Sequence, residues 1–176
     1  MKEITILRLD HRQHRDQRMT THLALISRAL GVKNMLYTGE RDTNLENSLD
    51  DVVKRWGGSF TINYIPGAKS FISNWKGITI HLTMYGEKHH ETIQDIKLLE
   101  DPILIIVGGT KVPGYIYDIA DFNTAVGWQP QSEAGAIAIF IHELLGSEML
   151  YARYPNSSIN IEGTGFKAER SERFKS

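Results

Sequence analysis

The sequence has no cysteine, no long apolar run and almost no net charge. Without cysteine among its 176 residues, the chain has no disulfide, no thiolate metal site and no thiol nucleophile. A transmembrane helix is excluded because no run of about 18 apolar residues occurs. Residues 1–9 lack the charged-then-apolar layout of a secretory signal. We therefore expect a cytoplasmic protein with no membrane partner.

Several motifs that would identify other functions are missing or incomplete. Neither the phosphate-binding P-loop nor the dinucleotide fingerprint Gly-x-Gly-x-x-Gly is present. His142-Glu143 is followed by Leu-Leu-Gly, so the zinc motif HExxH is not completed. The His89-His90 pair has no third ligand at a useful spacing, and no serine lies in a nucleophile-elbow sequence. We expect no metal site.

Positive charge is concentrated locally, although the net charge of the whole chain is only −1. A first block holds seven basic or histidine residues against Asp10 and Asp16: Arg8, His11, Arg12, His14, Arg15, Arg18 and His22. A second cluster lies near the end of the chain: Lys167, Arg170, Arg173 and Lys175. Each is compatible with an ordinary solvated surface. Brought together, they would form a positive strip suited to a nucleic-acid partner.

Apolar spacing predicts an α/β fold with a mainly parallel sheet flanked by helices. Period-two or continuous apolar patterns predict strands over residues 4–9, 34–38, 59–65, 78–84 and 103–107. Helical patterns cover residues 43–56, 88–99 and 132–145, and an earlier helix runs from Asp16 to a stop at Gly31. No linker or repeat interrupts the chain, so we expect one domain over residues 1–176. From about residue 147 the tail is either an extra helix or a flexible basic segment.

Two features of the C-terminal half suggest a ligand and a partner. Gly108-Gly109 directly follows the predicted strand 103–107, and a second loop, residues 126–133, leads into the last helix. Each loop alone is typical of a tight turn, but together they favour a shared small-molecule pocket near the carboxyl ends of the strands. The last helix is apolar almost all round, so another subunit could supply part of its cover.

Four segments of the sequence resemble a known family. They are LRLDH followed by RQHRDQRMTTHLALISRALG, then VGGTKVP, YDIADFNTAVGWQP and QSEAGAIAIF, in this order up to Leu145. The chain resembles the archaeal tRNA cytidine-56 2′-O-methyltransferases, a divergent branch of the SPOUT superfamily. The resemblance implies a C-terminal trefoil knot, which runs against the rule that chains are unknotted. It also implies a tRNA substrate and a homodimer in which the first motif of one subunit faces the cofactor of the other.

The resemblance also implies S-adenosyl-L-methionine (SAM) as cofactor, held by the knotted loops and one strand end. The implied cofactor-binding residues are Leu82, Gly108, Gly109, Thr110, Lys111, Val112, Val126, Gly127, Trp128, Gln129, Pro130, Gln131, Ser132 and Glu133. Trp128 and Gln131 stand where the family pattern has Asn and His, and Asp10 stands where it has a small residue. Trp128 would either stack on the adenine or plug the knot.

The first motif supplies the implied catalytic residues. Related enzymes use an arginine of this motif to activate the ribose 2′-hydroxyl, and we assign that role to Arg18, with Arg15 and Arg12 as phosphate-binding alternatives. A guanidinium does not readily lose its proton, so stabilising the alkoxide is the more plausible role. His22 is an alternative base, although a lone helical histidine is more often structural. Another SPOUT specificity, or a silent RNA-binding module, remains an alternative function.

Overall fold

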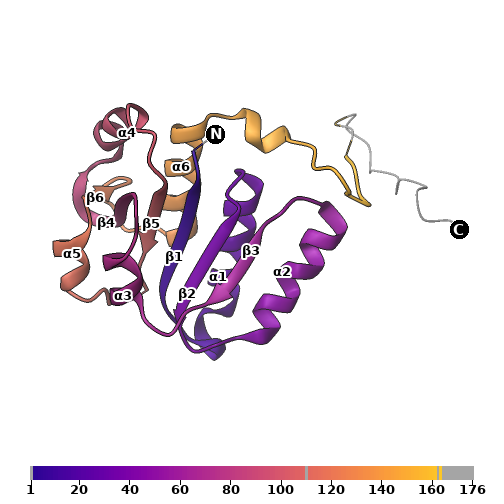
Figure 1. Cartoon of the computed structure of the whole chain (residues 1–176), viewed down its shortest axis with the longest axis horizontal. Helices are drawn as coiled ribbons and strands as arrows, with labels where there is room; N and C mark the ends of the chain where they lie inside the picture. The colour runs from indigo at the N-terminus through magenta and orange to yellow at the C-terminus, as the bar shows by residue number, and fades with distance from the viewer. Residues whose placement is uncertain (1, 110, 162, 164–176) are drawn as a thin grey trace, which may run out of the picture.

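A six-stranded parallel sheet forms the centre of the protein (Figure 1). The computed structural model describes residues 2–109, 111–161 and 163. Within these residues the strand order is β3-β2-β1-β5-β4-β6. The strands are β1 (Ile4–His11), β2 (Asn34–Gly39), β3 (Thr61–Tyr64), β4 (Ile78–Lys88), β5 (Ile103–Val107) and β6 (Phe122–Ala125). The α/β fold predicted from the apolar spacing is confirmed.

Helices cover both faces of the sheet, as a parallel sheet requires. One face packs against α1 (Gln13–Ala29), α2 (Thr43–Trp56), α4 (His89–Lys97) and α6 (Glu133–Leu145). The other face carries the two short helices α3 (Ala68–Ser73) and α5 (Tyr115–Ile119) over a smaller apolar cluster. Every residue of β5 is buried between these layers, which explains its continuous apolar sequence. Among the described residues, no helix is long and apolar enough to cross a membrane.

Side-chain caps and glycines set the boundaries of the two best-predicted helices. The carboxylate of Asp42 accepts the Leu45 N–H at 3.0 Å and begins α2, while the Ser132 hydroxyl accepts the Gly135 N–H at 3.0 Å and begins α6. Gly57, with φ of 73°, and Gly146, with φ of 85°, end them in a backbone region that other residues rarely adopt. These bounds agree with the predicted helices 43–56 and 132–145.

Three of the short elements were not predicted from the sequence. Helices α3 and α5 and strand β6 have only six, five and four residues, too few to display a period. Helix α1 also begins at Gln13, three residues before the predicted start at Asp16, because Arg12 is the extended N-cap residue. The C-terminal part of the sheet was therefore only partly predicted.

The strand order creates a switch point between β1 and β5. From β1 the chain adds β2 and β3 on one side of the sheet, while β5, β4 and β6 lie on the other side. In open parallel sheets, ligands bind outside the carboxyl ends of the strands at such a point. Here those ends carry Arg8 to His11 on β1, and β5 continues into Gly108. The architecture thus predicts a ligand site between the first motif and the first glycine loop.

Strand β6 crosses β4 at very close range. The β4–β6 register shifts between Leu82 and Glu87, and Gly86 lies directly on the backbone of β6. A Cβ on Gly86 would lie only 2.4 Å from the carbonyl oxygen of Asn123, so no larger residue fits there. This crossing lies within the segment for which the family resemblance implies a knot.

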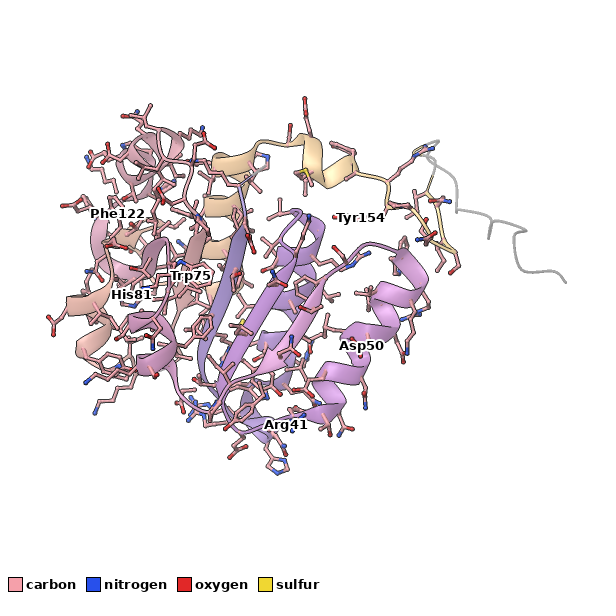
Figure 2. The ribbon with its side chains drawn as sticks, viewed as in Figure 1. Arg41, Asp50, Trp75, His81, Phe122 and Tyr154 are labelled. Atoms are coloured by element: carbon pink, nitrogen blue, oxygen red, sulfur yellow. The ribbon has the colours of Figure 1, made fainter. Side chains whose placement is uncertain are left out.

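The segment after α6 runs back across the molecule towards α2 (Figure 1). After the 3₁₀ turn η1 (Glu148–Tyr151), Tyr154 donates a hydrogen bond to the Arg28 carbonyl at 3.1 Å and stacks on its guanidinium (Figure 2). Ser158 then donates its N–H to the Arg55 carbonyl at 3.0 Å. Up to this point the tail is anchored to α1 and α2. The predicted basic cluster at Lys167, Arg170, Arg173 and Lys175 lies outside the described residues.

Candidate active site

A pocket of about 360 Å³ opens at the carboxyl ends of β4 and β5. Its volume lies within the roughly 300–1,000 Å³ range of small-molecule sites. Eleven of the predicted cofactor residues line it: Leu82, Gly108, Gly109, Val112, Val126, Gly127, Gln129, Pro130, Gln131, Ser132 and Glu133. The fold therefore brings one strand end and both glycine loops, far apart in sequence, to one cavity.

Three predicted cofactor residues are not found in the pocket wall. Thr110 lies outside the described residues, and Lys111 does not line the cavity. Trp128 is 59 % exposed; its indole N–H donates to the Gly86 carbonyl at 3.3 Å, and Lys88 lies 5.8 Å from its ring centroid. A ring this exposed does not plug the knot, so that interpretation of Trp128 was wrong.

The pocket wall includes six residues that were not predicted from the sequence: His81, Thr83, Met84, Tyr85, Tyr117 and Ala136. Four of them flank Leu82 on β4, whose end lies at the same sheet edge as the glycine loops. Tyr117 belongs to the resembling segment YDIADFNTAVGWQP. The four β4 residues reach the pocket because β4 lies beside β5, and the spacing of residues along the chain does not reveal that arrangement.

His81 is a neutral, buried imidazole beside this pocket (Figure 2). Asn123 donates its amide to the Tyr117 carbonyl at 2.9 Å, so its amide oxygen faces His81 Nδ1, also at 2.9 Å. Nδ1 therefore carries the proton. Burial lowers the pKa of His81, against a smaller raising effect of the Asn123 hydrogen bond. The buried Nε2 atom is thus a hydrogen-bond acceptor, and it has no partner among the described residues.

The wall of the pocket suits a ligand that carries hydrogen-bond donors and lies against bare backbone. A Cβ on Gly108 would meet Val112 Cγ2 at 2.0 Å, and Gly127 has φ of 78°. A larger residue at position 108 would therefore displace Val112, and Gly127 has a backbone conformation that other residues rarely adopt. In addition to His81 Nε2, Glu133 Oε2 is buried without a hydrogen-bond partner among the described residues. SAM carries donors on its ammonium, ribose and adenine groups, so the residues present fit it.

Glu133 belongs to a charged cluster behind the pocket. Arg8, only 1 % exposed, lies with its Nε 3.5 Å from Glu133 Oε2 and its Nη2 3.9 Å from Asp16 Oδ2. Burial raises the pKa of Glu133, although the positive charge of Arg8 opposes this. Burial also acts to raise the pKa of Asp16, but its hydrogen bond with Arg12 and the two arginine charges outweigh burial and lower it.

The structure separates the four predicted catalytic residues into two groups. Arg12 lies at the N-cap of α1, with its Nε 3.1 Å from Asp16, and is therefore connected to the cluster behind the pocket. Arg15, Arg18 and His22 are exposed and lie three or four residues apart on α1, hence on one face of that helix. None of the four lines the pocket of its own chain.

His11, also in the first motif, has a structural environment. It is fully buried, with Nδ1 2.9 Å from the Thr20 hydroxyl, Nε2 3.4 Å from Asp42, and its ring edge-on to Tyr37. Burial lowers its pKa, against the raising effect of the Asp42 hydrogen bond. Tyr37 accepts the Asp42 N–H and donates to Glu46, and burial raises its pKa to about 12. This network fixes the start of α1 against α2.

The two buried neutral histidines make stability depend on pH. Because the pKa of His11 and of His81 is lower in the folded chain than in the unfolded chain, the unfolded state binds more protons below about pH 6.5. The free energy of unfolding should therefore fall as pH drops below about 6.5, by up to about 1.4 kcal/mol per pH unit for each histidine. Urea titrations without ligand at pH 7.5 and 5.5 measure this. His81→Gln should reduce the difference in the free energy of unfolding between the two pH values. His90→Gln, which changes a side chain that is 57 % exposed, should leave this difference unchanged. An equal difference in the natural protein and in both variants would contradict the assignment.

Solved structures with the same fold define the class of protein. The SpoU methyltransferase AviRb from Streptomyces viridochromogenes matches with a TM-score of 0.61 and 11% identity, over 81% of this chain and 58% of that one. A TrmH/SpoU tRNA modifying enzyme from A. aeolicus matches with a TM-score of 0.60 and 12% identity, over 82% of this chain and 75% of the other. The chain thus has the fold of the SpoU and TrmH methyltransferases, the SPOUT class, and the knot is implied by that fold.

Sequence comparison then identifies the family within this class. The model of the family "tRNA ribose 2′-O-methyltransferase, aTrm56" matches residues 56–168. The tRNA (cytidine(56)-2′-O)-methyltransferase of Methanococcus vannielii is 44% identical over 170 residues, covering 93% of this chain and 94% of that protein. The Thermococcus kodakarensis enzyme of the same name is 43% identical, covering 91% and 92%. The chain belongs to this tRNA ribose 2′-O-methyltransferase family, and the resemblance of its motifs is confirmed.

Proposed function

We propose that this chain transfers a methyl group from SAM to the ribose 2′-oxygen of cytidine 56 in the T-loop of tRNA. The observation that carries the proposal is the pocket at the carboxyl ends of β4 and β5, which both glycine loops of the family motifs line. When bound there, SAM supplies a methyl group attached to a positively charged sulfonium. Gly108, Gly127 and Glu133 would hold it through bare backbone and one carboxylate.

The arginines at the N-cap and in the first half of α1 would act on the RNA side of the reaction. The ribose 2′-oxygen develops negative charge as it gives up its proton, and a fixed cation lowers the energy of that charge. We assign this role to Arg18, whose side chain is free of pocket contacts and exposed. Arg15 and Arg12 would bind phosphates, since guanidinium groups suit phosphate geometry. His22 remains an alternative base on the same face of α1.

We further propose that two copies pair through the groove between α1 and α6. This groove, about 480 Å³, is largely apolar; its wall includes Ile26, Ala29, Leu30, Ala138, Ile139 and Leu150. Ile139 is 41 % exposed and Leu150 49 % exposed. A second copy of the chain would cover them symmetrically, as in most homo-oligomers. Arg15, Arg18 and His22 share α1 with this groove, so pairing would bring them towards the partner's pocket.

Dimer formation can be tested at the centre of the groove. Ile139→Asp would place a carboxylate on the apolar face, and burying an unpaired charge there is costly. We expect the variant to elute and scatter as a monomer, with much reduced methyl transfer. Leu98→Asp is the matched control, because Leu98 is 84 % exposed at the end of α4 and away from the groove. A dimeric Ile139→Asp protein, or a monomeric Leu98→Asp protein, would contradict this interface.

The substrate itself is tested by one assay. The protein is incubated with tritiated SAM and an unmodified tRNA transcript, and the methylated nucleotide is then mapped. We expect the label in the ribose of cytidine 56. Label at another nucleotide would still agree with a SPOUT methyltransferase, but it would contradict the proposed specificity for cytidine 56. If calorimetry detected no binding of SAM or S-adenosylhomocysteine, the chain would instead be a silent RNA-binding module.

A further inference from the structure

Among the residues that the structure describes, Arg8 is the largest fully buried side chain, and it has no part in the mechanism described so far. It lies on the central strand β1, next to β5, with its backbone in register with Val107. A guanidinium stays protonated in proteins, so this position buries a permanent positive charge. Such burial is costly unless anionic groups surround the charge. The sequence placed Arg8 in a surface-like basic block, and its burial therefore needs an explanation.

The contacts of Arg8 join two parts of the site that are otherwise separate. Its Nε faces Glu133, the first residue of α6 and part of the pocket wall, at 3.5 Å. Its Nη2 faces Asp16 Oδ2 in the first turn of α1 at 3.9 Å, and Nη1 donates to the Leu9 carbonyl at 3.1 Å. The same Asp16 oxygen lies 3.1 Å from Arg12 Nε. A continuous chain of opposite charges thus runs from the pocket wall to Arg12.

We propose that Arg8 is a positioning residue that couples occupancy of the cofactor pocket to the placement of Arg12 for RNA. The guanidinium is a rigid planar fork, so a shift of its Glu133 side also moves its Asp16 side. The Glu133 pair has room to tighten, because Arg8 Nε and Glu133 Oε2 are both buried without a hydrogen-bond partner among the described residues. A ligand that fills the pocket against Glu133 would close this gap and draw Asp16 and Arg12 with it.

This inference rests on the proposed function, because it needs the cofactor in the pocket and RNA at Arg12. A residue that only neutralises buried carboxylates would affect stability and nothing else. If Arg8 couples the two sites, binding of either ligand must raise the affinity for the other, and the factor must be the same in both directions. That factor is a property of the two ligands together and is independent of turnover.

The test uses S-adenosylhomocysteine and unmodified tRNA, which bind without reacting. Calorimetry measures the affinity for S-adenosylhomocysteine with and without saturating tRNA. We expect tRNA to raise it roughly fivefold or more in the natural protein, and to change it by less than about twofold in Arg8→Lys, because a single ammonium does not span three partners. Arg28→Lys is the matched control: this α1 arginine contacts Gly57 and Tyr154, away from the pocket, and should keep the full factor.

A second variant makes the result independent of whether Arg8→Lys folds. Asp16→Asn keeps Arg8 and its Glu133 contact but weakens the link to Arg12, so it should bind S-adenosylhomocysteine normally and lose the coupling. A factor near one in the natural protein, or a full factor in Asp16→Asn, would overturn the proposal. Failure of the natural protein to bind S-adenosylhomocysteine at all would instead refute the proposed cofactor pocket.

Discussion

Replacing Arg18 with alanine is expected to lower the rate of methyl transfer by about 10²–10³-fold, the usual effect of removing one group that stabilises a developing oxyanion. The affinity for SAM should not change, because Arg18 does not line the pocket of its own chain and its side chain is exposed. Single-turnover transfer to tRNA and calorimetry with SAM measure the two quantities separately. The residue is in an exposed helical position, so the free energy of unfolding should change little.

Two comparisons make this prediction specific to Arg18. Arg55→Ala removes an exposed arginine from α2. This helix connects β2 and β3, which lie on the opposite side of β1 from the strands that form the pocket. The variant should retain normal methyl transfer. Arg15→Ala should weaken tRNA binding and make it less dependent on salt, because a phosphate contact releases counterions. Near-normal turnover in Arg18→Ala would end its assignment, and a large loss in His22→Ala would then favour the histidine as base.

Much of the framework was predictable because it depends on local signals. The amphipathic helix 43–56 shows a helical period in the sequence, and the buried strand 103–107 and the helix 132–145 show as apolar runs; Asp42, Gly57, Ser132 and Gly146 fix the ends of the two helices. The glycine loops were found for the same reason: two glycines after a buried strand have a known meaning in parallel sheets. These signals operate over a few residues and need no knowledge of the tertiary fold.

The parts that could not be predicted depend on contacts between distant segments. Arg8 and Arg18 look alike in the sequence, yet one is buried on the central strand and the other is exposed on α1. His81 came to the pocket because β4 neighbours β5, and Trp128 stayed outside it because its indole reaches Gly86. The knot itself came only from the family resemblance, since nothing in local spacing specifies which segment passes over which.

A mixture of two inactive variants should recover about one quarter of the natural activity if Arg18 serves the cofactor of the partner subunit. Gly127→Val is the second variant, because valine does not fit φ of 78° without strain and would project into the pocket wall, abolishing S-adenosylhomocysteine binding. After random exchange with Arg18→Ala, about half of the dimers are mixed, and each holds one intact pocket facing one intact Arg18. If Arg18 serves its own subunit instead, no dimer has a complete site and the activity stays at background.

The reverse arrangement gives the opposite order of activities, so a general loss of activity on mixing cannot account for both results. With both substitutions on one chain and the natural protein as partner, mixed dimers are inactive when Arg18 acts across the interface. Total activity is then about one quarter, contributed only by the natural homodimers. When Arg18 acts within its own subunit, each mixed dimer keeps one complete site and the total is about one half. Because Arg15, Arg18 and His22 lie on α1 beside the apolar groove and away from their own pocket, we expect the first of these results.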